Sequence, residues 1–236
     1  MFYREHLKCD LSTCEVVVKD TDLLIKADKP LYREGLEAVN KYRSQIEEYI
    51  TRNKFFKDTL QPIEVESDAY PIIKDMAKAA AVCGVGPMAA VAGAIAEYVA
   101  MDLSRYTTEL LIENGGDIFI KSQKERIVSI FAGDSIFSQK IGLKIEPCET
   151  PLGICTSSGT VGHSLSFGKA DAVTVTSKSA ILADAAATAI GNLVKGSADF
   201  KKALVFAKTI KGIDGILIIS GKNLCAWGKL TIEPIS

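Results

Sequence analysis

The chain has little of what marks several specialised classes of protein. Its net charge is −1, from 28 basic and 29 acidic residues, and it contains two histidines and one tryptophan. It therefore lacks the basic surplus of a nucleic-acid binder and the polybasic run of a membrane-surface protein. No apolar run has the length of a membrane span, and no apolar signal segment follows Met1. These absences predict a cytoplasmic protein that binds neither nucleic acid nor a membrane.

The cysteines form neither a disulfide framework nor a recognisable zinc motif. They lie at positions 9, 14, 83, 148, 155 and 225. His6, Cys9 and Cys14 are close in sequence but lack the paired C-x-x-C spacing of zinc sites. We expect free thiols in a reducing compartment. Cys155 has two interpretations, a buried apolar residue or a reactive thiol beside a hydroxyl-rich loop.

Hydrophobic periodicity predicts an alternation of strands and helices. Helical spacing covers residues 31–52, 69–83, 88–103, 180–194 and 198–210. Strand-like runs cover 15–19, 22–27, 109–112, 118–121, 127–131, 141–145, 153–156, 172–176, 216–219, 224–227 and 230–232. The order of strands, helices and strands occurs twice, without a Pro/Ser-rich linker between the two parts. We predict an α+β fold of mostly antiparallel sheets packed with helices, in one compact domain, 1–236, with halves at 1–147 and 148–236.

One predicted helix carries isolated polar groups among alanines. Residues 183–189 read Ala-Asp-Ala-Ala-Ala-Thr-Ala. Residues four apart share a helix face, so Asp184 and Thr188 point the same way. An ionised carboxylate on an apolar helix is costly unless it is solvated, paired or bound to a cation, and oxygen ligands suit Mg²⁺. The segment predicts a magnesium site; the alternative is an alanine-rich core helix whose Asp184 faces water.

Two further segments could contact a ligand. The first joins two strand-like runs and consists of Asn114, Gly115, Gly116 and Asp117. It is either a simple hairpin turn or a bare backbone that a ligand approaches, with Asn114 and Asp117 as hydrogen-bonding groups.

The second segment is rich in hydroxyl groups and contains Thr156, Ser157, Ser158, Gly159, Thr160 and His163. Hydroxyls and exposed N–H groups in a glycine-bearing loop can form a phosphate cradle, and His163 could act as a proton shuttle or charge partner. The alternative is a flexible surface loop.

These three segments, in this order, resemble the ApbE-like superfamily, the FAD:protein FMN transferases. That family carries an N-x-G-G-D turn, a T-S-G loop and an A-D-A-x-A-T-A helix, which residues 114–117, 156–159 and 183–189 match. Residues 86–97 and 157–164 look like a sibling group of short prokaryotic ApbE-like proteins of unsettled activity, and this likeness covers nearly the whole chain. The D-x-G-G-x-A-K-G-Y and H-I-I-D-P-x-T-G segments of the transferases are absent here.

The resemblance implies two tunnelling-fold-like β-α-α-β halves with a ligand cleft between them. It implies FAD or FMN in that cleft, with Mg²⁺ at the diphosphate held by Asp184 and Thr188. Residues 156–160 would lie near the phosphates and residues 114–117 at the cleft wall. The metal would act as a Lewis acid that makes FMN transferable, with Asp184 and His163 as the catalytic candidates.

Three functions stay open. The first is a magnesium-dependent enzyme that transfers FMN or cleaves the diphosphate of FAD or a similar nucleotide. The second is a non-catalytic binding or accessory protein of sulfur or cofactor metabolism, which the absent lysine and tyrosine of the transferase segment favour. The third binds a pterin or purine at a subunit interface. A homo-oligomer would cover the alanine-rich helices and exposed strand edges.

Overall fold

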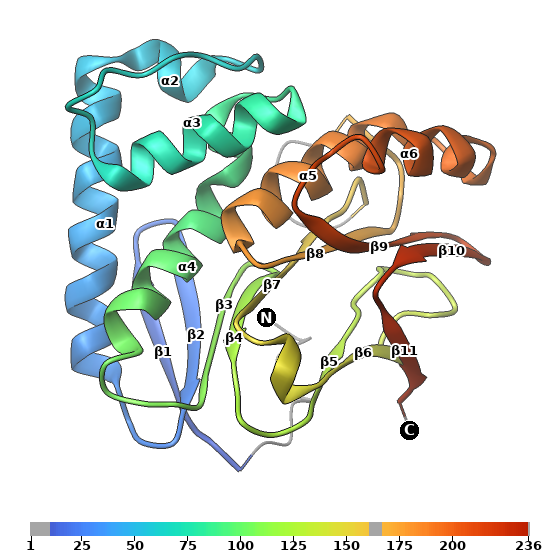
Figure 1. Ribbon diagram of the computed structural model, residues 1–236, viewed down its shortest axis with the longest axis horizontal. Coiled ribbons are helices and arrows are strands. Elements are labelled where there is room, and N and C mark those ends of the chain that lie inside the picture. Colours follow the sequence, from blue (N-terminus) through green and yellow to red (C-terminus); the bar gives the residue numbers. More distant parts are fainter. Residues whose placement is uncertain (1–9, 161–166, 236) are drawn as a thin grey trace.

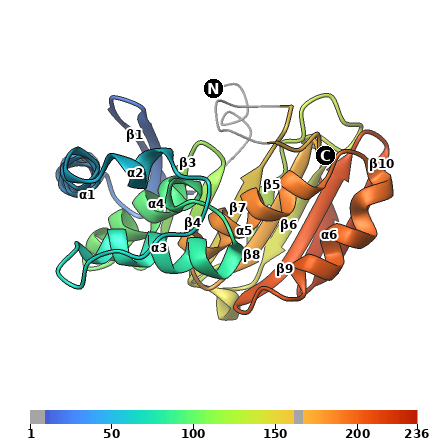
Figure 2. The ribbon, with the colours of Figure 1, turned by 90° about the horizontal axis from the view of Figure 1, so that it is seen from above.

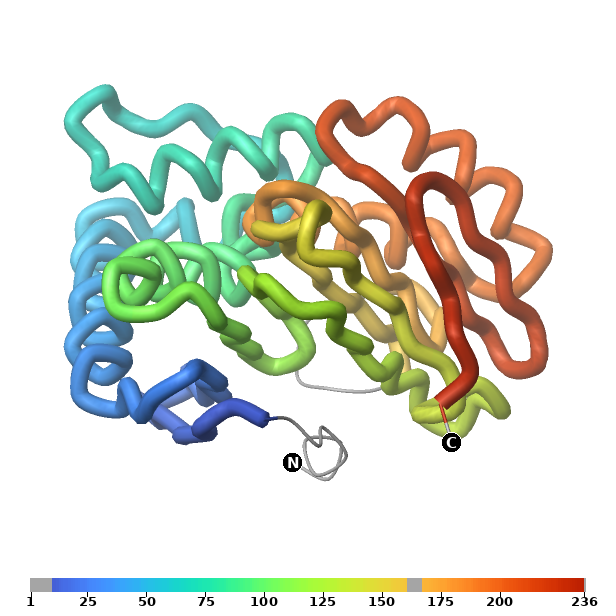
Figure 3. The backbone as a smooth tube through the Cα atoms, turned by 60° about the horizontal axis from the view of Figure 1, so that its bottom comes forward, coloured from blue at the N-terminus to red at the C-terminus, as the bar shows by residue number. Residues whose placement is uncertain are grey.

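An eight-stranded antiparallel sheet runs through the computed structural model, which describes residues 10–160 and 167–235 (Figure 1). Its strand order is β1-β2-β3-β4-β7-β8-β9-β10, so its strands are arranged in the order in which they occur along the chain, and each pairs antiparallel with the next. The strands are β1 (Ser12–Val18), β2 (Thr21–Ala27), β3 (Leu110–Asn114), β4 (Asp117–Lys121), β7 (Leu152–Ser157), β8 (Ala172–Ser177), β9 (Ile213–Ser220) and β10 (Asn223–Gly228). Figure 3 follows the backbone from β1–β2 at one end of the sheet to β9–β10 at the other.

The helices cover one face of this sheet (Figure 2). They are α1 (Tyr32–Arg52), α2 (Lys54–Asp58), α3 (Pro71–Cys83), α4 (Val91–Leu103), α5 (Ala180–Leu193) and α6 (Phe200–Ala207), with 3₁₀ turns at Pro87–Ala90, Pro147–Glu149 and Ser197–Asp199. Helix α4 packs on β3 and β4, and α5 packs on β7 and β8. Helices α4 and α5 also contact one another. The two alanine-rich helices therefore meet over the middle of the sheet, where β4 pairs with β7.

A three-stranded sheet lies on the other face. Its order is β11-β6-β5, made of β5 (Arg126–Ser129), β6 (Ile141–Ile145) and β11 (Thr231–Pro234). Apolar side chains of both sheets form a second core, which includes Ile120, Val128, Leu143, Ile154 and Leu217. The molecule thus has three layers: helices, the long sheet and the short sheet.

Spacing and ring contacts explain the position of α4. The buried face of α1 contains Ala38, Val39, Tyr42, Ile46 and Tyr49, at the three- and four-residue steps of an amphipathic helix. The rings of Tyr42 and Tyr98 meet edge to face at 5.0 Å between centroids. Tyr98 lies on α4, so this aromatic pair fixes α4 against α1.

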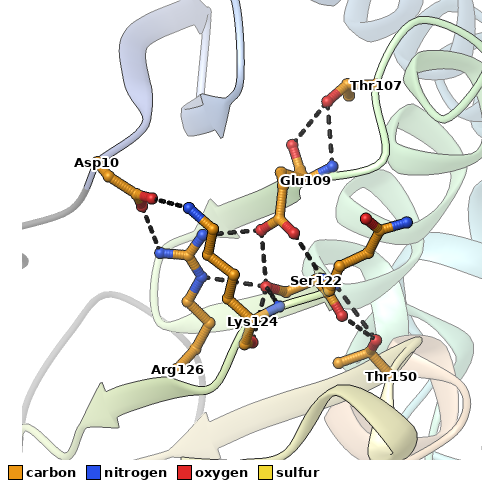
Figure 4. A network of polar contacts seen from close by, with 8 residues as sticks. Asp10, Thr107, Glu109, Ser122, Lys124, Arg126 and Thr150 are labelled. Carbon is orange, nitrogen blue, oxygen red and sulfur yellow. Dashed lines mark hydrogen bonds and ion pairs between the residues drawn. The ribbon is translucent and has the colours of Figure 1, made fainter.

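A network of charged and polar groups joins the two sheets (Figure 4). Arg126 on β5 donates to Glu109 Oε2 at 2.7 Å and to Asp10 Oδ1 at 2.7 Å. The Ser122 hydroxyl also donates to Glu109 Oε2, at 2.7 Å. Lys124 forms a further ion pair with Asp10. Since Glu109 precedes β3 and Arg126 begins β5, the network fastens the short sheet to the long one.

The predicted α+β class is confirmed, and the predicted helices and strands occur close to their expected bounds. Three details differ. Helix α2 was not predicted, because its five residues are too few to show a hydrophobic period. A 3₁₀ turn occupies the predicted start of α4, and another occupies the predicted start of α6. The compact domain 1–236, the halves 1–147 and 148–236 and the tunnelling-fold-like duplication stay predictions.

Hydropathy identifies no individual helix, among the described residues, that could cross a membrane. Helix α3 and the segment Pro87–Leu103 pass the length and composition test only together, and a bend of 104° separates them.

Candidate functional site

The predicted turn between β3 and β4 is a hairpin that buries a carboxylate. Asn114 pairs with Asp117 across the turn. Gly115 and Gly116 have φ of 66° and 105°, in the left-handed region that favours glycine, and Gly116 N donates to Glu113 Oε1 at 2.8 Å. Asp117, the first residue of β4, is 8% exposed. The hairpin interpretation is therefore confirmed, and the turn also carries a buried acid toward β7.

Strand β7 brings the start of the hydroxyl segment to that acid. Because Ile118 pairs with Ile154, the next residues of β7 lie beside Asp117. Thr156 N donates to Asp117 Oδ1 at 3.3 Å. The Cys155 thiol donates to the carbonyl oxygen of Ala180, the first residue of α5, at 3.3 Å, and it also lies beside the Asp117 carboxylate. The first two predicted segments and α5 therefore meet at one place.

Helix α5 carries Asp184 into the protein rather than into water. Asp184 is 8% exposed, so the alternative in which it faces solvent is wrong. Its Oδ2 accepts a hydrogen bond from Gly93 N at 2.9 Å, and the N–H of Ala92 also donates to the carboxylate. Both amides belong to the first turn of α4, which has no side-chain cap of its own. Asp184 thus caps α4 from a neighbouring helix.

Thr188 lies one turn further along α5, as predicted. It is half-buried. No hydrogen bond to its hydroxyl occurs within residues 10–160 and 167–235. That oxygen therefore has free lone pairs for a ligand, four residues from Asp184.

The contact between α4 and α5 depends on Gly93. A Cβ at this position would lie 2.4 Å from the Ala180 carbonyl oxygen and 2.8 Å from Asp184 Cβ. Asn114 Nδ2 donates to the carbonyl oxygen of Ala92 at 3.1 Å. Asn114 and Asp184 therefore hold the same short stretch of α4, one through its carbonyl and the other through its amides.

Burial and a neighbouring acid raise the pKa of each aspartate. Burial raises the pKa of Asp184 well above its usual range, and the charge of Asp117 raises it further, against the hydrogen bonds from α4. Burial also raises the pKa of Asp117, and the nearby Glu113 adds to this. In the part of the chain that the structure describes, neither aspartate has a lysine or arginine ion-pair partner. The site therefore holds two buried acids with no basic partner, among the described residues, to stabilise their ionised forms.

The thiols at this site are not nucleophiles. Cys155 is fully buried, and burial raises the pKa of its thiol, followed by the charges of Asp117 and Asp184. Burial likewise raises the pKa of Cys83, to about 12, with Asp184 contributing. Both groups stay protonated at neutral pH. The interpretation of Cys155 as a buried packing residue is confirmed.

Beyond Thr156, the hydroxyl segment runs from the Asp117–Asp184 pair toward the protein surface. Thr156 Oγ1 lies 2.9 Å from Thr174 Oγ1 on β8. Ser157 lies against Gly191 of α5, and Ser158 and Gly159 follow. Thr160 is exposed, and its hydroxyl donates to Asp171 Oδ1 at 3.2 Å. His163, His6 and Cys9 lie outside the described residues. The phosphate-binding role of residues 156–160 stays a prediction.

Sequence reasoning missed Glu97 on α4. Its Oε2 accepts hydrogen bonds from the Ser179 hydroxyl at 2.9 Å and from Ile181 N at 3.1 Å. Burial raises its pKa, and these donors partly offset that. The signal was available, because Glu97 lies among the apolar residues of an alanine-rich helix, as Asp184 does.

Two cavities are lined by residues outside these segments. One, of about 250 Å³, has Lys144, Lys178 and Lys229 among its lining residues, and the other, of about 180 Å³, lies beside Glu34 and Asp102. The predicted ligand cleft between the halves stays a prediction. Within the described ranges, no three His, Cys, Asp or Glu residues converge in a metal-holding group. A cation at the acid pair would therefore need hydroxyl, backbone or ligand oxygens as well.

Comparison with known proteins agrees with this architecture. The family model described as AbpE bacteria matches residues 4–211. The chain belongs to this family. A UPF0280 protein of Methanocaldococcus jannaschii is 42% identical over 221 residues, which are 91% of this chain and 90% of that protein. A UPF0280 protein of Methanocella arvoryzae is 39% identical over 222 residues, 92% of this chain and 89% of that protein.

Two solved structures share the fold. The flavinyl transferase ApbE of Pseudomonas stutzeri, in its apo form, has a TM-score of 0.57 at 15% identity, with 92% of this chain and 94% of that chain covered. The ApbE protein of Thermotoga maritima has a TM-score of 0.58 at 13% identity, covering 95% and 96%. The predicted membership of the ApbE-like superfamily, beside uncharacterised siblings, is thus confirmed.

Proposed function

We propose that the protein binds a flavin nucleotide, or another diphosphate ligand, together with Mg²⁺ at the Asp117–Asp184 site. The observation that carries this proposal is the burial of two carboxylates, of which Asp117 raises the pKa of Asp184, without a basic partner among the described residues. Burial of unpaired charge is costly. A bound cation would remove that cost, so the arrangement favours a cation as the missing partner.

The donor chemistry suits a hard divalent ion. Asp184 supplies a carboxylate oxygen, Asp117 adds a second carboxylate beside it, and Thr188 supplies a hydroxyl that has no other partner among the described residues. Mg²⁺ prefers oxygen ligands and is commonly held by one or two carboxylates plus substrate phosphates. Asp184 and Thr188 would hold the ion, with Asp117 as the neighbouring acid. When bound, the ion would supply Lewis-acid activation of a diphosphate.

The protein's own groups would then bind and orient the nucleotide. Gly93 N–H holds one oxygen of Asp184 in a fixed direction, which leaves the carboxylate preorganised. Residues 156–160 would donate hydroxyl and backbone hydrogen bonds to phosphate oxygens, and residues 114–117 would form the adjoining wall. His163 is the candidate for proton transfer to or from the acceptor. FMN transfer and cleavage of the FAD diphosphate are the reactions that such a site supports.

The flavin part of the proposal draws on likeness of fold. Structural neighbours are named flavin transferases, and their fold is the fold of this chain. The absent D-x-G-G-x-A-K-G-Y segment favours the second candidate, an accessory protein of sulfur or cofactor metabolism that binds without catalysis. A cytoplasmic location and a homo-oligomeric state remain part of the proposal.

Calorimetric titration tests this function directly. Purified protein is titrated with FAD and with FMN, with and without MgCl₂, alongside Asp184→Asn and the surface control Asp102→Asn, whose aspartate pairs with Lys41. We expect magnesium-dependent binding in the wild type and in Asp102→Asn, and its loss in Asp184→Asn. Binding followed by release of FMN or AMP would favour the enzyme, and binding without turnover the accessory protein. Absence of binding in the wild type would refute the flavin proposal.

A further inference from the structure

Helices α4 and α5 cap one another's first turns. Asp184 of α5 accepts hydrogen bonds from the amides of Ala92 and Gly93 at the start of α4. Glu97 of α4 accepts hydrogen bonds from Ser179, which precedes α5, and from Ile181 N at the start of α5. The two contacts show that the helices pack antiparallel. Gly93 at the start of α4 contacts Asp184 within α5, and Glu97 further along α4 contacts Ser179 and Ile181 at the start of α5.

The first turn of α5 is also held by its own N-cap residue and by close contact with strand β7. Ser179 Oγ accepts from Leu182 N at 3.3 Å while donating to Glu97, so Glu97 extends the ordinary N-cap of this helix. The backbone of Ala180 lies so close to β7 that a Cβ on Gly153 would be 2.4 Å from Ala180 Cα. The Cys155 thiol contacts the Ala180 carbonyl oxygen. Asp184 follows this turn on the same helix, so a displacement of the turn displaces its carboxylate.

We propose that Glu97 is the positioning residue of the Asp184 site: by holding the first turn of α5 from α4, it sets where Asp184 presents its carboxylate to a cation. This inference rests on the proposed function, because it names the residue that prepares the same site. Glu97 itself contacts the helix start and not the ligand. A negative side chain at a helix N-terminus is also favourable electrostatically.

The test compares Glu97→Ala, Glu97→Gln and a control, Glu109→Ala. Glutamine keeps an oxygen acceptor for Ser179 and Ile181 N, whereas alanine removes it. Glu109 is a buried acid of the network in Figure 4, so its loss lowers stability without contact to α5. The first readout is amide hydrogen exchange at Gly93, which needs no ligand. The second is the magnesium-dependent affinity for FAD.

We expect Glu97→Ala to speed exchange at Gly93 and to weaken magnesium-dependent FAD binding, each by at least about tenfold, the scale set by one lost hydrogen bond to a charged group. Glu97→Gln should restore both to within about threefold of the wild type. Glu109→Ala should change the exchange at Gly93 and the FAD affinity only as much as its loss of global stability accounts for.

The outcomes separate the two proposals. The positioning role is refuted, whatever the ligand, if the Gly93 amide exchanges equally fast in Glu97→Ala and Glu109→Ala once the global stability of each variant is taken into account. If the wild type binds FAD with magnesium and Glu97→Ala binds it equally well, the role is again refuted. If exchange responds as expected but the wild type binds no FAD, the positioning of Asp184 stands and the flavin function fails.

Discussion

Two groups of buried acids in this protein have opposite surroundings. Glu109 has Arg126 as a partner, together with the Ser122 hydroxyl and the Gln123 amide (Figure 4). Burial alone would raise the pKa of Glu109, but these hydrogen bonds outweigh burial and lower it. Asp117 and Asp184 are equally buried, yet the pKa of both is raised: burial is the main cause, with Glu113 adding to the rise at Asp117 and Asp117 adding to the rise at Asp184.

The difference separates structural charge from functional charge. A buried acid beside an arginine completes a contact that the fold already contains. Two buried acids that face one another without a cation leave a free-energy cost that the fold does not offset. Such a cost is tolerated where a ligand relieves it, and strongly perturbed acids cluster at functional sites for this reason. By this comparison Glu109 serves the fold, and the raised pKa values of Asp117 and Asp184 support the binding role that we propose for them.

The largest effect should come from closing the space between α4 and α5. In Gly93→Ala, the new Cβ meets the Ala180 carbonyl oxygen and Asp184 Cβ, so the helices must separate. We expect a loss of about 3 kcal/mol in the free energy of unfolding, the upper part of the range for overpacking, measured by urea denaturation. Gly196→Ala is the control, because nothing lies within 4 Å of its Cβ position. Equal stability of the two variants would contradict the close packing at Asp184.

The next largest effect concerns the paired acid. Glu109→Gln removes the negative charge that accepts a hydrogen bond from Arg126, and we expect a loss of about 1.5–3 kcal/mol in the free energy of unfolding, the range for hydrogen bonds to charged groups. Because the pKa of Glu109 is lowered on folding, its contribution is present above the unfolded value, about 4.3, and is lost as the pH falls. Denaturation at pH 7 and pH 3 should therefore show the difference from the wild type shrinking in acid. A difference that grows in acid would overturn the assignment.

The smallest effect should have the opposite sign. Asp117→Asn keeps an oxygen that accepts from Thr156 N but removes a negative charge beside Asp184. In metal-free buffer with EDTA we expect unfolding stability equal to the wild type or higher, by less than about 1 kcal/mol. The same denaturation series measures it. A loss as large as that of Glu109→Gln would mean that Asp117 is a structural acid, and the contrast between the two regions would disappear.

Much of this arrangement was predictable from local sequence, and the rest depends on distant contacts. Alanine spacing placed Asp184 and Thr188 on one helix, and the Asn-Gly-Gly-Asp turn predicted the hairpin, because both signals are local. The cap from Asp184 to Gly93 joins residues 91 apart, and that from Glu97 to Ser179 joins residues 82 apart. No period in the chain encodes such pairs. The same limit applies to β11, whose strand character was predicted but whose pairing with β6 was not.

Direct metal binding tests the central claim, that Asp117 and Asp184 form a cation site. Mn²⁺, a spectroscopic substitute for Mg²⁺, is titrated into nucleotide-free protein and followed by electron paramagnetic resonance, for the wild type, Asp184→Asn, Asp117→Asn and Glu109→Gln. The claim predicts one bound ion in the wild type and in Glu109→Gln, with affinity at least about tenfold weaker in both aspartate variants, the scale of one lost charged contact. Equal Mn²⁺ binding by the wild type and Asp184→Asn, or no binding by the wild type, would contradict it.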